Sequence, residues 1–307
     1  MTGYIIRRLL QVIPITFGIM TLIFALIHMI PGDPAVQIAG ESARAADVER
    51  VRAQLGLDKP LWDQYVAYLT GILRGDLGVS FRTQQPVADQ VFQRYPATMQ
   101  LAFGGMVVAL LVAFPLGIVS AIYRNSWIDN VARFFALFGV SMPSFFFGPL
   151  LIIAFAIHLG WLPVSGREEG FRSMILPSLT MGLALAAILT RMIRVSLAEE
   201  LNQLYITTAL AKGVGRKKAI FVHGLRNALI PVITIVGLQF GSLLTGAIIT
   251  EQIFSWPGLG RLLIQSINAR DYPQVQASIL VIALTYILIN LITDILYAFV
   301  DPRISYD

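Results

Sequence analysis

The chain has 307 residues, of which 56% are hydrophobic and only 13% are charged. Soluble domains usually carry about 25% charged residues, so this composition excludes an ordinary water-soluble protein. Cysteine is absent, which excludes disulfides and thiolate metal sites, and the three histidines (His28, His158 and His223) lie too far apart to form a spaced metal-binding pair.

Six apolar stretches are long enough to cross a membrane, since a spanning helix needs about 20 apolar residues. In chain order they are 9–30, 99–123, 131–160, 174–193, 229–250 and 277–300. Arg7 and Arg8 precede the first stretch, but its length and the lack of a small-x-small cleavage pattern before Pro31 favour a retained anchor over a signal peptide. The third stretch exceeds the thickness of a bilayer, which predicts a tilted or protruding helix, and Pro143 and Pro149 within it predict kinks or helix starts.

The segment 31–98, between the first two spans, is predicted to be partly helical. A short helix over 47–55 is expected to end at Gly56, and Pro60 is placed to begin a second one. Four residues then recur at helical spacing: Trp62, Tyr65, Leu69 and Ile72. Such a helix would lie on the membrane surface or cover the mouth of the bundle, although a plain packing face is the simpler interpretation.

Positive charge is concentrated between the fourth and fifth spans. The stretch 191–226 holds seven basic and two acidic residues, so its net charge of +5 equals that of the whole chain. Cytoplasmic loops are enriched in Lys and Arg, which predicts that this loop and both termini are cytoplasmic. A nucleic-acid patch is disfavoured, because the stretch lies between two spans and has little aromatic interleaving.

Motifs for catalysis and for nucleotide binding are missing from the sequence. It contains no G-x-x-x-x-G-K-[ST], no H-E-x-x-H and no G-x-S-x-G. Asp294 is the only acidic residue within a predicted span, whereas ion-coupled carriers usually bury several ionisable groups near the midplane. A non-catalytic transport subunit is therefore favoured, and a stand-alone channel or ion-coupled secondary transporter is the alternative.

The loop 195–228 is the largest predicted cytoplasmic feature. Residues 201–212 are compatible with a helix, Gly213 and Gly215 interrupt it, and 216–224 show a second helical pattern. These short helices have too little apolar surface to fold alone. The residues themselves leave two interpretations open, a surface that docks against a partner and a solvated loop.

The fifth span carries small and polar residues at regular spacing. Gly237, Gly241 and Thr245 fall four residues apart on one face, which favours close packing against another helix. Gln239, Ser242 and Thr245 are the candidate pathway-lining residues.

Two segments of the cytoplasmic loop carry a family resemblance. Tyr-Ile-Thr-Thr-Ala-Leu-Ala-Lys-Gly at 205–213 and His-Gly-Leu-Arg-Asn-Ala-Leu-Ile-Pro at 223–231 closely resemble the EAA loop of binding-protein-dependent ABC importer permeases. The likeness is specifically to the dipeptide and oligopeptide branch. Ala209 and Gly213 match the general loop pattern. The sequence departs from the general loop pattern at Thr207, Thr208 and Arg226. These departures resemble the peptide branch's own variant of the loop.

Shorter motifs extend the resemblance over nearly the whole chain. They are Pro31-Gly-Asp-Pro34, Gln54-Leu-Gly-Leu-Asp-Lys-Pro60, Gly75-Asp-Leu-Gly-Val-Ser80, Phe254-Ser-Trp-Pro-Gly-Leu-Gly260, Arg270-Asp-Tyr-Pro273 and Asp301-Pro-Arg303. Each is weak alone, but they occur in order and on the predicted sides of the membrane.

The resemblance implies an all-α integral membrane protein, a type I ABC importer permease (MetI-like) bundle of six transmembrane helices in the bacterial inner membrane. The implied substrates are dipeptides, oligopeptides or glutathione, and relatives handle nickel complexes. The implied partners are a second homologous permease, two cytoplasmic ABC ATPases and an extracytoplasmic peptide-binding protein. The chain itself would bind no cofactor, metal or nucleic acid, because ATP and Mg are bound by the ATPases.

The implied organisation consists of four parts and a loop. These are 1–30 with the first helix, the extracytoplasmic insertion 31–98, the core 99–300 containing the coupling loop 195–228, and a cytoplasmic tail 301–307. Gly213 would be the hinge between two coupling helices, and Ala209 would pack into an ATPase groove. The basic residues would contact either acidic ATPase surface or lipid headgroups. The candidate coupling residues are Tyr205, Thr208, Ala209, Lys212, Gly213, Arg216, Lys217, His223, Leu225, Arg226 and Asn227.

Overall fold

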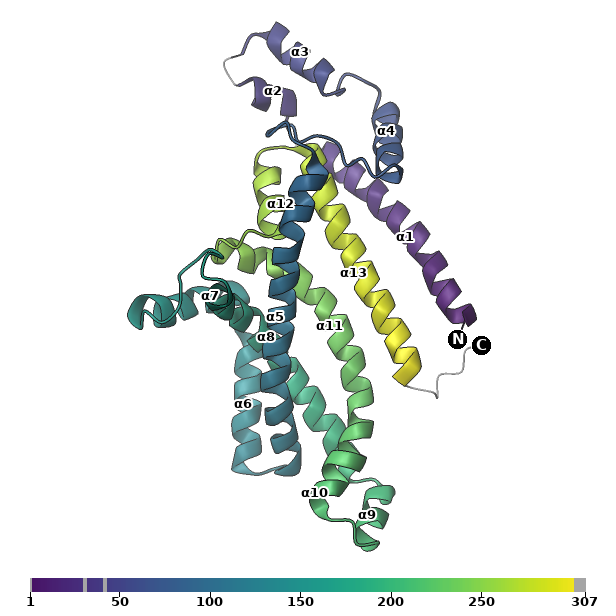
Figure 1. Ribbon diagram of the computed structural model, residues 1–307, viewed down its shortest axis with the longest axis vertical. Coiled ribbons are helices and arrows are strands. Elements are labelled where there is room, and N and C mark those ends of the chain that lie inside the picture. Colours follow the sequence, from purple (N-terminus) through teal and green to yellow (C-terminus); the bar gives the residue numbers. More distant parts are fainter. Residues whose placement is uncertain (1, 30–31, 41–42, 301–307) are drawn as a thin grey trace. The chain divides into compact units, whose positions relative to one another are not determined.

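The computed structural model describes residues 2–29, 32–40 and 43–300, and its regular elements there are helices (Figure 1). They are α1 (Thr2–Met29), α2 (Pro34–Ala39), α3 (Ala45–Gln54), α4 (Leu61–Leu73), α5 (Val87–Ile122), α6 (Trp127–Ser141), α7 (Ser144–Leu151), the π-helix η1 (Ile152–His158), α8 (Phe171–Leu201), α9 (Leu204–Ala211), α10 (Arg216–Lys218), the π-helix η2 (Ala219–Gly224), α11 (Leu225–Ile253), α12 (Leu259–Asn268) and α13 (Tyr272–Val300). The predicted tail 301–307, with its Asp301-Pro-Arg303 motif, and Pro31 lie outside the described residues.

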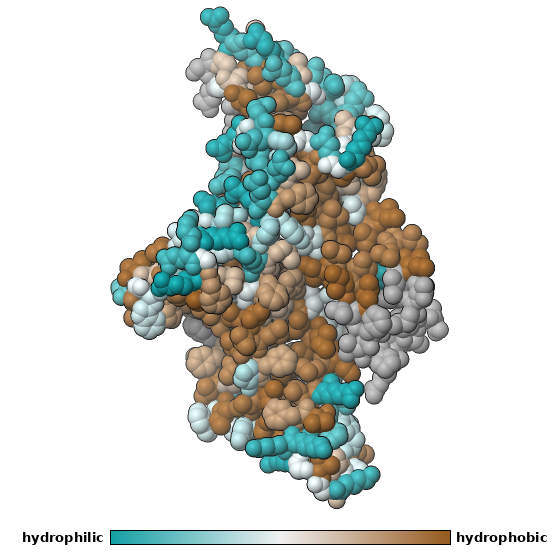
Figure 2. Space-filling model, in the orientation of Figure 1, coloured by the Kyte–Doolittle hydropathy of each residue, from teal (hydrophilic) through white to brown (hydrophobic). Residues whose placement is uncertain are grey.

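Within this part of the chain, five helices are long and apolar enough to cross a membrane. They are Ile6–Met29, Val87–Ile122, Phe171–Leu201, Arg216–Ile253 and Tyr272–Ile295. They account for all of the predicted spans except the third. The surface over the long helices is mostly apolar, whereas hydrophilic residues gather over α3 and over α9 and α10 (Figure 2). The prediction of an all-helical membrane protein is confirmed.

The predicted third span, 131–160, is wrong as a single helix. α6 ends at Ser141, and Pro143 takes the N-cap position of α7 with φ −63° and ψ 138°. Proline has no N–H to donate and disfavours the helical region for the preceding residue, which favours the end of α6 at this point. Beyond Pro143 the chain forms a short apolar helical segment, Phe145–His158, whose second half is π-helical. The prediction of a helix start at Pro143 is confirmed.

The chain forms two compact units that are described separately. Unit 1 contains Met99–Trp256 and residues of both chain ends, and unit 2 contains Ile6–Thr98 and Pro257–Ile287. In unit 1, α8 packs against α6, α7 and α11. The most apolar stretch of α8 is 67% buried, against 39% for that of α5 and 28% for that of the helical stretch Arg216–Ile253. α8 is therefore the central helix of unit 1.

Small residues allow the helices of unit 1 to approach closely. A Cβ added to Gly182 of α8 would lie 2.6 Å from the backbone oxygen of Gly105 in α5, which is closer than real Cβ atoms come to any neighbour. A Cβ added to Gly237 of α11 would overlap the side chain of Thr293 in α13. The predicted packing role is thus confirmed for Gly237, whereas Thr245 is exposed.

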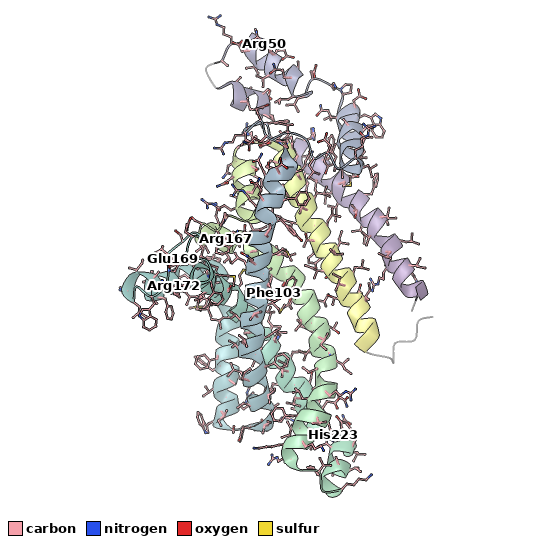
Figure 3. The ribbon with its side chains drawn as sticks, viewed as in Figure 1. Arg50, Phe103, Arg167, Glu169, Arg172 and His223 are labelled. Carbon is pink, nitrogen blue, oxygen red and sulfur yellow. The ribbon has the colours of Figure 1, made fainter. Side chains whose placement is uncertain are left out.

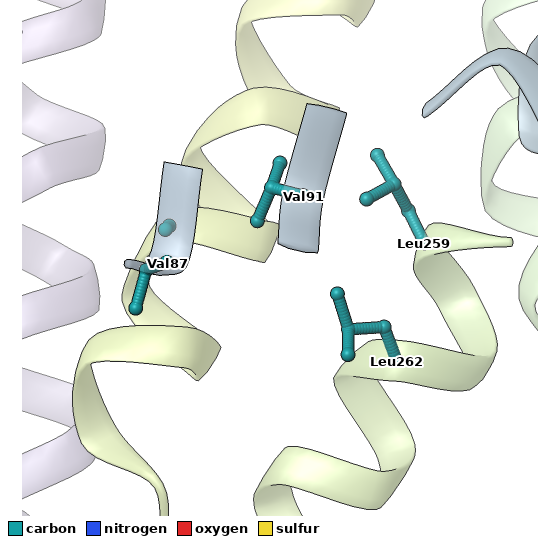
Figure 4. Packing of buried hydrophobic residues seen from close by; sticks show 5 residues of the cluster. Val87, Val91, Leu259 and Leu262 are labelled. Atoms are coloured by element: carbon teal, nitrogen blue, oxygen red, sulfur yellow. The ribbon is translucent and has the colours of Figure 1, made fainter. Parts of the chain in front are cut away.

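The core of unit 2 joins the first turns of α5 to α12. Val87 and Val91 pack against Leu259 and Leu262, and Ala277 of α13 completes the cluster (Figure 4). α5 therefore begins inside the segment 31–98, twelve residues before the predicted span at 99.

The two helices predicted in the segment 31–98 are confirmed as α3 and α4. Gly56 has φ +68°, and the N–H groups of Gly56 and Leu57 donate to the carbonyls of Ala53 and Arg52 at 3.1 and 3.0 Å. This is the hydrogen-bond pattern of a glycine-capped helix end. Pro60 immediately precedes α4.

A buried carboxylate holds the loop between α4 and α5. Asp271 is 3% exposed and accepts hydrogen bonds from the hydroxyl of Ser80 at 2.5 Å and from the backbone N–H of Phe81 at 3.0 Å. The motif at 75–80 therefore contacts the motif at 270–273, and both lie within unit 2.

Candidate functional site

The predicted coupling loop folds into an elbow, defined here as residues 204–218, which projects beyond the ends of α8 and α11 (Figure 1). Its first helix, α9, begins at Leu204 rather than at 201, because α8 continues to Leu201. The second predicted helix, 216–224, is not a separate element. α10 and η2 run directly into α11, so one continuous helical stretch extends from Arg216 to Ile253. The elbow is thus directly connected to the fifth span.

Gly213 ends α9 in a left-handed backbone conformation with φ +85°. The N–H of Gly213 donates to the carbonyl of Leu210 at 3.0 Å, and the N–H of Val214 donates to the carbonyl of Ala209 at 3.1 Å. No atom lies within 4 Å of a Cβ added at Gly213, so glycine is required by the backbone and not by space. The turn is a hydrogen-bonded helix cap.

The hydroxyl of Tyr205 connects three elements of unit 1. It donates to the carboxylate of Glu200 at the end of α8, and it accepts a hydrogen bond from Nδ2 of Asn227 in α11 at 3.0 Å. It also lies 3.4 Å from the backbone oxygen of His223, which Figure 3 labels in η2. Burial and then the hydrogen bond to Glu200 raise the pKa of Tyr205, so the hydroxyl stays protonated.

The outer surface of the elbow is basic. Lys212, Arg216 and Lys217 of the elbow are exposed, as is Arg226 at the beginning of α11, and none of them forms an ion pair within the described residues. Thr208 is exposed, Ala209, His223 and Leu225 are half-buried, and Ile206, which is 3% exposed, anchors α9 from its inner face. The structure therefore places the predicted coupling residues in the elbow and in the helical turns that follow it, η2 and the beginning of α11.

Sequence reasoning missed a buried ion pair near this end of unit 1. Asp129 of α6 is fully buried and accepts two hydrogen bonds from Arg194 of α8, at 2.6 Å from Nε and 2.8 Å from Nη2. Ser120 of α5 donates a third, at 2.5 Å. These hydrogen bonds, led by that of Arg194, hold the pKa of the Asp129 carboxyl well below its usual range. A lone Asp in a loop of mixed charge gives no sequence indication of burial.

Two of the three candidate pathway residues line one cavity. This cavity, of about 240 Å³, lies between α8 and α11 and contains Gln239 and Ser242 together with Thr180 and Thr250. The hydroxyl of Ser242 donates to the backbone oxygen of Gln239 at 2.8 Å. Thr245 does not line this cavity, to which α11 contributes Gln239, Ser242, Leu243, Gly246 and Thr250.

Five long apolar helices and a basic projection define this chain as a multi-spanning membrane protein. Residues 113–306 match the family described as binding-protein-dependent transport system inner membrane component, and residues 1–102 match its N-terminal family. The chain belongs to this family and is a permease subunit of an ABC importer. It is therefore a non-catalytic inner-membrane subunit, and neither a stand-alone channel nor an ion-coupled carrier. In this family ATP is handled by ATPase partners, and the permease binds no cofactor.

The chain is similar over its full length to curated relatives. It is 47% identical over 306 residues to the glutathione transport system permease protein GsiC of Escherichia coli (strain K12), with 100% of each chain covered. The corresponding proteins of Shigella dysenteriae serotype 1 and Shigella flexneri serotype 5b are also 47% identical over the same length.

Solved structures support the same fold. The inward-facing MetNI methionine ABC transporter matches with a TM-score of 0.58 at 16% identity, covering 69% of this chain and 96% of that chain. An amino acid ABC transporter matches with a TM-score of 0.52 at 18% identity, covering 71% and 95%. The predicted type I importer fold is thus confirmed.

Proposed function

We propose that this chain imports short peptides or glutathione across the bacterial inner membrane. It would act with a second homologous permease, two cytoplasmic ABC ATPases and an extracytoplasmic peptide-binding protein. The substrate class is supported by full-length similarity at 47% identity to glutathione transport permeases and by the motifs of the peptide branch. The elbow is the single feature that carries the proposed mechanism.

The elbow would be the contact with an ATPase on the cytoplasmic side. Its exposed cations suit an acidic protein surface, and the excess of basic residues in 191–226 favours a cytoplasmic location under the positive-inside rule. In this orientation both termini are cytoplasmic and the segment 31–98 is extracytoplasmic. Ala209 and Thr208 would face the ATPase groove.

Movement of the elbow would reach the pathway through one continuous helix. ATP-driven closure of the ATPases displaces α9, and the Tyr205 hydroxyl transmits the displacement to Asn227 at the beginning of α11. α11 carries Gln239 and Ser242, which line the cavity against α8. Alternating access results if the rearrangement of α11 opens this cavity first to one side of the membrane and then to the other.

Reconstitution tests this function. The chain is placed in proteoliposomes with its partner permease, both ATPases and the binding protein, and uptake of labelled glutathione, a dipeptide and a pentapeptide is measured. We expect ATP-dependent uptake of at least one of them, and no ATP hydrolysis by the chain alone. A matched preparation contains ATPases that bind ATP but cannot hydrolyse it. Equal uptake in that preparation, or no uptake of any peptide, would contradict the proposal.

A further inference from the structure

Unit 2 contains a cavity of about 600 Å³ that has no part in the proposed coupling path. It is an open pocket lined by the end of α1, the loop 55–59, α4, Phe81 and the first turn of α13. Small-molecule sites typically have volumes of about 300–1,000 Å³ and combine apolar walls with a few polar groups. The cavity has the size and composition of a ligand site.

Aromatic rings form a continuous wall of this cavity. The ring centroids of Tyr68 and Phe24 are 5.9 Å apart, those of Phe24 and His28 are 4.2 Å apart, and those of His28 and Tyr272 are 5.9 Å apart. Phe81 continues the wall, 6.3 Å from Tyr272. The faces of Phe and Tyr rings attract cations, and clustered rings are a common way to bind an ammonium group.

Hydrogen bonds hold this wall together across three parts of the chain. His28 of α1 contacts Oε1 of Gln64 in α4 through Nε2 at 3.2 Å, and its Nδ1 contacts the backbone oxygen of Phe24 at 2.8 Å. The amide nitrogen of Gln64 donates to the backbone oxygen of Lys59 at 2.8 Å. α1, the loop before α4 and α4 itself are therefore fixed relative to one another, so the cavity is preformed.

Two opposite charges complete the cavity. Lys59 and Asp63 both line it, both are exposed, and neither forms an ion pair within the described residues. Asp63 is an acceptor for an ammonium group, and Lys59 is a donor to a carboxylate or phosphate. Burial raises the pKa of Tyr68 to about 12, so its phenol adds no charge of its own.

We propose that this cavity is a binding site for a small zwitterion. The ammonium group of the ligand lies against the aromatic wall and Asp63, and its carboxylate or phosphate lies against Lys59. A free short peptide and the ethanolamine headgroup of a phospholipid both carry this chemistry. Only the assignment of the site to the outer side rests on the proposed function, because binding itself requires no ATPase.

The test uses the full chain in nanodiscs and two probes. Binding of trialanine is measured by calorimetry in phosphatidylglycerol nanodiscs, which contain no zwitterionic headgroup. Retention of phosphatidylethanolamine is measured by native mass spectrometry after purification from mixed lipid. The variants are Asp63→Asn and Lys59→Gln, and Asp58→Asn is the matched control in the same loop, because Asp58 does not line the cavity. Elution volume and melting temperature verify that each variant is folded.

We expect wild type and Asp58→Asn to bind one probe, and Asp63→Asn and Lys59→Gln each to weaken that binding about tenfold, as expected for loss of a charged partner. Binding of trialanine identifies a peptide site, and retention of phosphatidylethanolamine identifies a lipid site. Wild type that binds neither probe, or Asp63→Asn and Lys59→Gln that bind like Asp58→Asn, would overturn the proposal. Peptide uptake that fails in reconstituted vesicles would instead count against the proposed function and leave this site intact.

Discussion

The side-chain amide of Asn227 donates a hydrogen bond to the hydroxyl of Tyr205 at 3.0 Å, which ties α9 of the elbow to the beginning of α11. The same hydroxyl donates to Glu200 at the end of α8. A single oxygen atom therefore connects the element that would contact an ATPase with the helix that carries the candidate pathway residues.

Tyr205→Phe removes this oxygen and leaves the ring in place. A hydrogen bond contributes about 0.5–1.5 kcal/mol, so we expect the number of substrate molecules imported per ATP hydrolysed to fall by roughly twofold to tenfold. ATP hydrolysis itself should continue. Tyr123→Phe is the matched control, because Tyr123 is exposed at the end of α5 and its hydroxyl has no hydrogen bond within the described residues. Equal ratios in the two variants would refute a coupling role for Tyr205.

The ion pair of Asp129 and Arg194 should be essential for stability. Asp129→Asn leaves the Arg194 guanidinium partly buried without a counter-charge, which typically costs about 3–5 kcal/mol. Thermal unfolding in detergent measures this cost. Glu199→Gln, an exposed change of the same chemistry in α8, should alter stability by no more than about 0.5 kcal/mol. A melting temperature for Asp129→Asn equal to that of Glu199→Gln would contradict the assignment.

The same ion pair predicts that the unfolding free energy of the chain falls at acid pH. The folded-state pKa of Asp129 lies below its unfolded value of about 3.9, so the stabilisation is fully present above about pH 4. It is lost as the pH falls further, through the folded-state pKa. The difference in unfolding free energy between wild type and Asp129→Asn should therefore be constant from pH 7 to about pH 5 and shrink below pH 4. A difference that changed between pH 7 and pH 5 would assign the effect to another group.

Gly182→Ala should loosen the crossing of α5 and α8. The added methyl group would meet the backbone oxygen of Gly105 at 2.6 Å, and backbone cannot move aside as a side chain can. Overpacking of this kind costs about 1–3 kcal/mol, measured as a lower melting temperature. Gly18→Ala in α1, where nothing lies within 4 Å of the new carbon, should be neutral or stabilising. Similar losses in the two variants would contradict close packing at Gly182 as the cause, because only Gly182 has a neighbour that the added methyl group would meet.

The orientation can be measured directly because the chain has no cysteine. Lys217→Cys in the elbow and Trp62→Cys in α4 each introduce a single thiol at an exposed position. A membrane-impermeant maleimide added to intact spheroplasts should label Trp62→Cys, and it should label Lys217→Cys only after permeabilisation. The reverse pattern would place the elbow outside and exclude an ATPase contact.

The helices were predictable from the sequence where a local feature, such as a long apolar run or a glycine at a helix end, determines the structure. Apolar runs indicated five of the spans, and Gly56 and Gly213 marked helix ends because positive φ strongly favours glycine. Composition alone could not show that Pro143 divides the third apolar run, because proline is also tolerated inside membrane helices. The burial of Asp129 and the close approach at Gly182 depend on which helices meet. Such contacts between distant segments leave no periodic pattern in a single sequence.

The coupling role of the elbow is tested most directly by Gly213→Pro in the assembled importer. Proline fixes φ near −65° and removes the N–H that donates to Leu210, so it cannot adopt the turn at φ +85°. Gly213→Asn, which tolerates positive φ, is the control. We measure substrate uptake and ATP hydrolysis in the same vesicles. Assembly and hydrolysis that persist in Gly213→Pro while uptake is lost are the predicted result, and normal uptake by this variant would contradict the proposed coupling.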